Sequence, residues 1–289
     1  MTRRTTEPGP HPRPRIDWLA HAVLGLGVVL FAFPVWLVFA GATQDPGAIN
    51  RGDISLLPRL SHLGIFLSVL RHGDGATTTP VWHMLMVSAG MALGIAIGKI
   101  VISLLSAYAV VFFRFPFRML AFWTIFITLM LPVEVRIIPT YAVMADFHMI
   151  NSFAGLTVPL IASATATLLL RQVFLAIPDE LVEAARMDGA GPIRFLFDIL
   201  IPVSAANLAA LFVILFVYGW NQYLWPLLVA TDPRLDTIVI GIVQLIDTGF
   251  QLTPWNTMMA MSVLAILPPV IVVVAMQRWF VKGLTEVEK

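Results

Sequence analysis

The sequence predicts an all-α polytopic membrane protein with six transmembrane helices, and three observations support that prediction. Of its 289 residues, 58% are hydrophobic and only 12% are charged, whereas an ordinary soluble domain carries about 25% charged residues. The mean hydropathy is +0.87. Six stretches approach or exceed the ~20 mostly apolar residues that a helix needs to cross the hydrocarbon core. The alternating segments of about ten residues that are typical of a membrane β-barrel are absent from the sequence.

The six spans are expected, in chain order, at residues 18–42, 84–112, 118–144, 155–174, 206–230 and 257–280. The first resembles a signal peptide, because Arg13 and Arg15 precede it and residues 40–42 (AGA) look like a cleavage site. Its apolar run exceeds the ~7–15 residues of a signal peptide core, so we interpret it as a retained anchor. The third contains residues 131–136 (LPVEVR), which should break or kink its helix.

The placement of Lys and Arg predicts that both termini are cytoplasmic. With the N-terminus inside, 12 of the 18 Lys and Arg side chains fall in inside segments and 5 in outside segments, and Lys99 lies within a span. This bias follows the positive-inside rule. The expected organisation is a Pro-rich cytoplasmic tail (1–17), a first transmembrane helix (18–43), a periplasmic loop (44–82), a membrane core (83–282) and a cytoplasmic tail (283–289).

Leucines recur at helical spacing within the periplasmic loop, at positions 56, 60, 63, 67 and 70. They are typical of a short helix that packs on the core or lies at the membrane interface. They also fit a docking surface for an external partner, and the sequence leaves both interpretations open.

The composition excludes several classes of function. The 18 Lys and Arg residues are offset by 17 Asp and Glu, and the net charge of +1 provides no basic surface for nucleic acids. There is no cysteine, which excludes disulfides, thiolate zinc sites and cysteine nucleophiles. The six histidines include no H-E-x-x-H pair, so we expect neither a metal site nor catalytic residues.

A cytoplasmic loop at residues 171–202 is predicted to form two short helices. Pro178 followed by Asp179 and Glu180 favours a helix start, because proline needs no N–H there and acidic residues stabilise the positive end of the helix dipole. Gly189 can end this helix in a left-handed conformation. Apolar residues from Ile193 onward then begin a second helix. The small residues between the helix start and Gly189 suit a short helix that inserts into a cleft of another protein.

This loop resembles the EAA motif of ABC importer permeases, E-A-A-x3-G-x9-I-x-L-P. The matching residues are Glu183, Ala184, Ala185 and Gly189, followed by residues 199–202 (ILIP), in which Ile201 replaces leucine. Residues 218–226 (YGWNQYLWP) and 104–109 (LLSAYA) are similar to segments of the carbohydrate-type members. Residues 126–136 and 179–186 are most similar to the members that import sn-glycerol-3-phosphate.

The resemblance implies a type I ABC importer transmembrane domain in a bacterial cell inner membrane. Its implied partners are a second homologous permease, two copies of a cytoplasmic ATPase and a periplasmic substrate-binding protein. The implied ATPase-coupling residues are Glu183, Ala184, Ala185, Asp188 and Gly189. ATP and Mg would be bound by the ATPase, so we expect no cofactor in this chain and no enzymatic activity of its own.

The sequence itself contains no phosphate-binding loop. Gly94 and Gly98 before Lys99 are too closely spaced for one, and they lie within a span. Together with Gly90, they are better interpreted as a small-residue face for helix packing.

Lys99, Glu134 and Arg136 are ionisable residues at membrane depth, where charges usually face a cavity or a partner. In one interpretation Glu134 pairs with Arg136 or Lys99 and holds two spans in register. In the other, the two cations contact a phosphate during passage. Both hold if Glu134 neutralises the cations when substrate is absent.

The fifth span carries polar and aromatic residues that complete the predicted substrate pathway: Trp220, Asn221, Gln222 and Tyr223. Buried amides need polar partners, so Asn221 and Gln222 favour a wall that contacts a glycerol moiety. The alternative is an interfacial aromatic belt, which suits Trp225 best. Pro268 and Pro269 should break the sixth span, as a gating bend or a permanent kink.

The expected function is translocation of sn-glycerol-3-phosphate or glycerophosphodiesters by alternating access. The main alternative is the same machinery importing a neutral sugar or oligosaccharide, for which Lys99 and Arg136 would be unnecessary. A secondary transporter should show inverted repeats and more intramembrane carboxylates. An intramembrane enzyme lacks any plausible catalytic cluster in the sequence.

Overall fold

The computed structural model describes residues 18–73, 79–132, 134–246 and 254–285, and within these ranges the chain contains no strand. The all-helical prediction is confirmed. The predicted tail at 1–17 and the last four residues of the tail at 283–289 lie outside the described residues.

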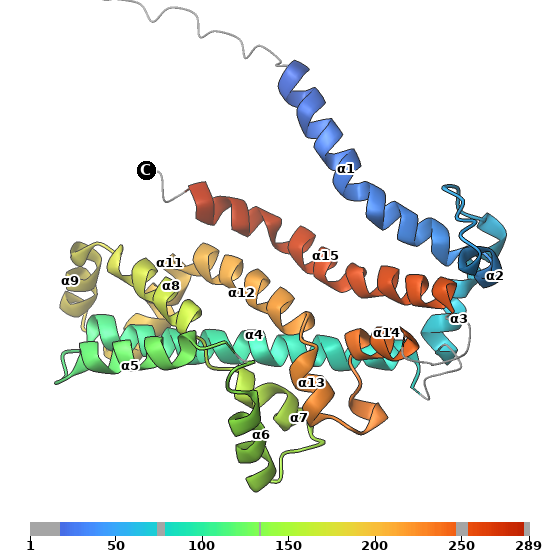
Figure 1. Cartoon of the computed structure of the whole chain (residues 1–289). Coiled ribbons are helices and arrows are strands. Elements are labelled where there is room, and N and C mark those ends of the chain that lie inside the picture. Colours follow the sequence, from blue (N-terminus) through green and yellow to red (C-terminus); the bar gives the residue numbers. More distant parts are fainter. Residues whose placement is uncertain (1–17, 74–78, 133, 247–253, 286–289) are drawn as a thin grey trace, which may run out of the picture.

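The bounds of the elements are as follows, with η marking 3-10 helices, except that η3 is a π-helix (Figure 1). They are α1 (Trp18–Ala42), α2 (Pro46–Asn50), η1 (Leu60–His62), α3 (Gly64–His72), α4 (Val81–Phe112), α5 (Arg118–Met130), α6 (Ile137–Asp146), α7 (Phe153–Thr157), η2 (Val158–Leu160), α8 (Ala164–Leu175), α9 (Asp179–Met187), α10 (Pro192–Arg194), η3 (Phe195–Leu200), α11 (Ile201–Val203), α12 (Ala205–Trp220), α13 (Leu224–Val229), η4 (Pro233–Leu235), α14 (Ile238–Ile246) and α15 (Trp255–Thr285).

Three single helices, α1, α4 and α15, are long and apolar enough to cross a membrane. Two bent pairs pass the same test: α7 and η2 with α8, bent by 50°, and α10 to α11 with α12, bent by 77°. The third expected span is divided into α5 and α6 around the break predicted at 131–136. With 13 residues, α5 is shorter than the ~20 residues that a straight crossing needs.

The fifth span differs from the expected range of 206–230. Helix α12 ends at Trp220, and the chain resumes as α13 at Leu224. Pro226 explains the interruption, because its ring would clash with the carbonyl of residue 222 in a continuous helix. The break predicted at Pro268 and Pro269 is absent, because α15 continues as one helix from Trp255 to Thr285 with both prolines inside it.

Helix α4 is the centre of the bundle and packs against α8 and α12. A Cβ added to Gly90, Gly94 or Gly98 would lie 3.2, 3.2 or 2.6 Å from the side chains of Phe153, Thr157 and Ile161, respectively. Both rows advance by four residues, which is the ridge-into-groove pattern of close helix packing. The predicted small-residue packing face is confirmed.

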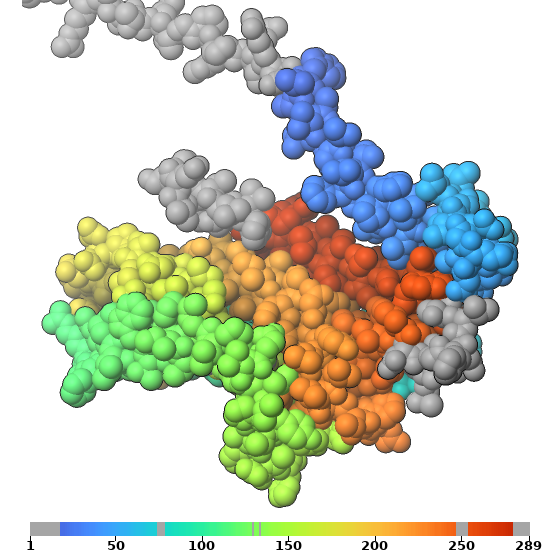
Figure 2. Space-filling view, viewed as in Figure 1, coloured from blue at the N-terminus to red at the C-terminus, as the bar shows by residue number. Residues whose placement is uncertain are grey.

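Helix α1 contributes little to this core. Only its last three residues, 40–42, are buried, and its N-terminal part stands clear of the remaining chain (Figures 1 and 2). Its contacts are mainly with α15. Such a column of exposed apolar side chains requires lipid or another subunit around it.

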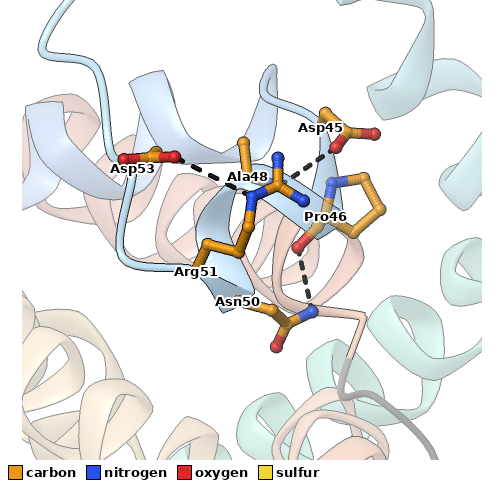
Figure 3. A network of polar contacts seen from close by, with 6 residues as sticks. All are labelled: Asp45, Pro46, Ala48, Asn50, Arg51 and Asp53. Carbon is orange, nitrogen blue, oxygen red and sulfur yellow. Dashed lines mark hydrogen bonds and ion pairs between the residues drawn. The ribbon is translucent and has the colours of Figure 1, made fainter.

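Residues 43–55, directly after α1, form a compact hydrogen-bonded polar unit rather than a loose loop. Asp45 caps α2 by accepting from the Ala48 amide at 3.0 Å, and Asn50 donates to the Pro46 carbonyl at 2.9 Å (Figure 3). The Gln44 side chain, 3% exposed, binds both backbone groups of Ser55. Of the leucine row, only positions 67 and 70 fall within α3, and Leu60 lies in η1.

Candidate functional site

The loop that resembles the EAA motif forms the predicted helix α9, which begins at Asp179 directly after Pro178. Gly189 follows the helix with φ +71°, in the left-handed region that favours glycine. Both sequence predictions for the ends of this helix are confirmed. At one end of the molecule, α9 lies beside α5 and α8 (Figure 1).

The five expected coupling residues divide between the two faces of this segment. Glu183, Ala184, Asp188 and Gly189 are exposed. Ala185 is only 5% exposed and belongs to the chain's own hydrophobic core. Its small size therefore lets α9 approach the bundle, and the exposed face is left for contacts with another protein.

An aromatic cluster supports α9 from within the bundle. The Tyr108 hydroxyl donates to the carbonyl of Pro192 at 2.8 Å, which ties the end of α4 to the chain just after α9. The Phe112 ring lies 5.3 Å from the Phe195 ring. These residues and Ala185 line an adjoining cavity of about 300 Å³. The hydrogen bond and the ring contacts thus join α10 and η3 to α4, and Ala185 places α9 against the same cluster.

The second helix of the loop is not a simple α-helix. Residues 195–200 adopt a π-helix between the short helices α10 and α11. Pro202 lacks an N–H and so disturbs the hydrogen bonding of the preceding turn, and π-helical turns often accompany functional sites. Arg194 and Asp198 form an exposed ion pair at 3.2 Å within this stretch.

The three charges expected at membrane depth line one cavity of about 290 Å³. Lys99 comes from α4, and Glu134 and Arg136 come from the break between α5 and α6. The start of α8 lines the same cavity through Ser163, Ala164 and Thr165. The structure therefore brings together residues that are up to 119 positions apart in the sequence, from Lys99 to Tyr218.

Lys99 is 6% exposed, and its Nζ lies 3.7 Å from the centre of the Tyr218 ring. A cation over an aromatic face is stabilised by the ring quadrupole. Tyr218, which also lines the cavity, was not among the predicted site residues. The sequence could have identified Tyr218 as a site residue, because it lies one helical turn before Gln222 and so shares a face of the predicted fifth span with it.

Glu134 forms no ion pair with Lys99 or Arg136. In the described parts of the chain, ion pairs join only Arg51 to Asp53 and Arg194 to Asp198. The cavity thus contains two cations and one exposed carboxylate. The N-terminus of α8, capped by the Ser163 hydroxyl accepting from the Ala166 amide at 3.2 Å, adds the positive end of a helix dipole.

The four residues predicted in the fifth span do not line this cavity. Trp220 is 3% exposed and packs on Phe216, with ring centres 5.9 Å apart. Asn221 is exposed at the end of α12, and Tyr223 is half-buried. Gln222 donates to the Tyr218 carbonyl at 3.1 Å. Only Gln222 therefore connects with the cavity, through Tyr218.

Trp225 is not part of an interfacial aromatic belt. It is 1% exposed, and its indole Nε1 donates to the Gly155 carbonyl at 3.0 Å. This bond joins α13 to α7 inside the molecule, so the belt interpretation is wrong for this residue. Adjacent apolar residues in the sequence did not reveal that the ring points inward.

Comparison with known proteins gives the following similarities. The family described as "Binding-protein-dependent transport system inner membrane component" matches residues 99–286. A curated relative from Brucella melitensis biotype 1, named "sn-glycerol-3-phosphate transport system permease protein UgpE", is 54% identical over 283 residues and aligns with 96% of this chain and 99% of its own length. Relatives of the same name from Agrobacterium fabrum and Escherichia coli O157:H7 are 56% and 53% identical over 279 and 277 residues, with the same shares covered.

A solved structure is also similar in fold. It is described as a bacterial ABC transporter involved in the import of the acidic polysaccharide alginate, and its chain superposes with a TM-score of 0.77 at 21% identity. The match covers 95% of this chain and 100% of the solved chain. The type I permease fold is therefore confirmed.

Proposed function

Because the chain belongs to the family of binding-protein-dependent transport system inner membrane components, we propose that it is the permease subunit through which an ATP-driven importer moves sn-glycerol-3-phosphate or glycerophosphodiesters. The observation that carries this proposal is the identity of 53–56% along 96% of the chain to permeases named for that cargo. A permease of this family lies in the inner membrane as one component of a transport system with other components.

The proposed partners are a second homologous permease, two copies of a cytoplasmic ATPase and a periplasmic binding protein. The exposed apolar surface of α1 supports a neighbouring subunit in the membrane. The exposed side of α9, with Glu183, Ala184, Asp188 and Gly189, supports a contact with the ATPase. The ATPase would bind ATP and Mg. This chain would supply α9, the helix that moves when the ATPase closes.

In the proposed coupling step, ATP-driven closure of the ATPase moves α9 together with the bundle. Ala185 seats α9 on the aromatic cluster, and the Tyr108 hydroxyl holds the following turn. A displacement of α9 is therefore transmitted to α4, which carries Lys99. The substrate path beside α4 and α12 would close and reopen, so that it faces the two sides of the membrane in turn.

The proposed path for the anionic cargo passes the cavity of Lys99, Arg136 and the start of α8. Arginine suits bidentate contact with phosphate oxygens, and lysine acts as a point charge. Glu134 would lower the local positive charge when no cargo is present, so that the phosphate is not held too tightly to leave. Gln222 and Tyr218 would hold Lys99 toward the cavity, whereas Asn221 and Tyr223 do not line it.

Uptake by the complete importer in vesicles tests the cargo. We expect ATP-dependent accumulation of labelled sn-glycerol-3-phosphate, competition by unlabelled glycerophosphodiesters, and no competition by glycerol or a neutral disaccharide. Stimulated uptake of the neutral sugar without uptake of the phosphate ester would overturn the proposed cargo in favour of the carbohydrate alternative. Uptake that persists without ATP would instead indicate a secondary transporter.

A further inference from the structure

A second charged cavity lies beside α9, at the same end of the molecule as the aromatic cluster. It measures about 430 Å³. Arg114 reaches it from the turn between α4 and α5, Arg118 from the first residue of α5, and Arg186 from α9. Two carboxylates, Asp179 and Glu183, line it as well. The proposed transport path does not use this cavity.

The three guanidinium groups outnumber the two carboxylates and have unused hydrogen-bonding capacity. None of the three arginines forms an ion pair within the described ranges. Arg114 and Arg186 are exposed, and Arg118 is half-buried. Each guanidinium has five N–H donors in a planar fork that matches phosphate oxygens. The cavity therefore offers an excess of donors to an anion.

Aromatic rings in the same turn indicate the environment of this cavity. Phe113, Phe115 and Phe117 are 41%, 39% and 78% exposed and alternate with the arginines. Phe117 has φ 60°, an uncommon conformation for a bulky residue, and α5 begins at the next residue. Exposed rings next to arginines are typical of the boundary between lipid headgroups and acyl chains.

The apolar surface continues from this turn along α5. Leu120 and Trp123 are 63% and 50% exposed. Acyl chains can cover this surface while a phosphate at the headgroup level reaches the cavity. A soluble anion would use the arginines but would leave the rings and α5 uncovered.

We propose that this cavity binds the phosphate group of an anionic phospholipid from the adjoining leaflet. Basic pockets of this kind at membrane interfaces are known to recognise lipid headgroups. The headgroup would bridge Arg186 of α9 to Arg114 of the α4–α5 turn and Arg118 at the start of α5, so that the lipid holds α9 against the bundle. The site is independent of the cargo, and its test does not require transport.

The test uses the complete importer in nanodiscs of phosphatidylcholine with increasing phosphatidylglycerol, and native mass spectrometry counts the bound phosphatidylglycerol. The variant combines Arg114→Gln and Arg118→Gln. Because each arginine near an anionic lipid contributes to binding roughly independently, loss of both should weaken retention of phosphatidylglycerol about thirtyfold. Arg278→Gln is the matched control, since Arg278 is an exposed arginine near the end of α15, next to the exposed Trp279, and does not line the cavity. The control should retain phosphatidylglycerol as the native protein does.

A second variant distinguishes lost lipid binding from misfolding, and a second ligand distinguishes a lipid headgroup from a soluble anion. Arg114→Lys with Arg118→Lys preserves the charge and should recover part of the retention, which guards against a loss caused by misfolding. Inorganic phosphate at millimolar concentration, added to the discs that contain phosphatidylglycerol, should not displace the bound phosphatidylglycerol. Equal retention by the native and double-Gln proteins, an equal loss in Arg278→Gln, displacement by inorganic phosphate, or retention that appears only after the ATPase has been removed from the importer would each overturn the proposal. The last outcome would assign the arginines to a protein contact.

Discussion

Lys99 is a buried cation whose ammonium group faces both an aromatic ring and an open cavity. The Tyr218 ring stabilises it at 3.7 Å, and such contacts contribute about 0.5–2 kcal/mol depending on desolvation. A full ion pair would hold the charge more tightly and leave it less available. The geometry therefore suits a group that contacts an anion transiently.

Replacing Lys99 by Met should lower uptake of the phosphate ester about tenfold or more at limiting concentration, because a hydrogen bond to a charged group is worth about 1.5–3 kcal/mol. Lys99→Arg should keep much of the uptake. Tyr218→Leu should cause a smaller loss, and Tyr218→Phe, which preserves the ring, should cause almost none. Initial rates of labelled uptake measure all four variants. Native uptake by Lys99→Met would show that Lys99 has only a structural role.

Single residues were predicted unevenly from the sequence. Charges within an apolar run identified Lys99, Glu134 and Arg136, since a desolvated charge needs a cavity or partner wherever the fold places it. Tyr218 and Trp225 were missed or misassigned because the direction of a side chain depends on packing between distant helices. Trp225 finds its acceptor at Gly155, 70 positions away in the sequence.

At the scale of elements, close approach of α12 to α4 depends on a missing side chain. A Cβ on Gly219 would lie 2.9 Å from the Cα of Ala92, which is backbone and cannot move aside cheaply. Gly25 in α1 is the natural control, because nothing lies within 4 Å of the same position there.

We expect Gly219→Ala to destabilise the protein by about 1–3 kcal/mol through overpacking. Gly25→Ala should be neutral or slightly stabilising, because alanine is the better helix former by about 1 kcal/mol. Thermal unfolding in detergent compares the two variants at equal protein concentration. Equal melting temperatures for the two alanine variants would contradict the tight α4–α12 contact.

The connection between α9 and α4 leads to a second prediction at this scale. Tyr108→Phe keeps the aromatic cluster but removes the donor to the Pro192 carbonyl. A lost hydrogen bond of about 1 kcal/mol shifts the population in which α10, directly after the α9 turn, is docked on α4 about fivefold. The number of cargo molecules imported per ATP hydrolysed should therefore fall, while ATP hydrolysis itself persists. Tyr141→Phe, at a 38% exposed tyrosine of α6, is the control and should leave this ratio unchanged.

The breaks between helices were predicted from the sequence in one case and missed in another. The break at 131–136 was predicted because proline and two charges interrupt an apolar run. The end of α12 at Trp220 was not, because average hydropathy measures apolarity and not the continuity of a helix. Gly189 was the more informative signal, since the left-handed conformation that it adopts is a local property of the chain.

The whole molecule has two distinct ends. Helix α9 lies at one end, and the polar unit that contains α2 lies with α3 at the other (Figure 1). The distribution of Lys and Arg predicts that the α9 end faces the cytoplasm. Contact with an ATPase requires the same orientation, so one experiment on sidedness tests a premise shared by the charge argument and the coupling proposal.

Single-cysteine labelling can decide this orientation, because the chain contains no native cysteine. Met187→Cys on α9 replaces a side chain that is 83% exposed, and Asp53→Cys replaces an exposed carboxylate in the polar unit. With the chain expressed without an ATPase, a membrane-impermeant maleimide should label Cys at 53 from the periplasmic side and Cys at 187 only in inverted vesicles. A membrane-permeant maleimide should label both in either preparation and so controls for accessibility. Labelling of position 187 from the periplasmic side would reverse the topology, and α9 could not then meet a cytoplasmic ATPase.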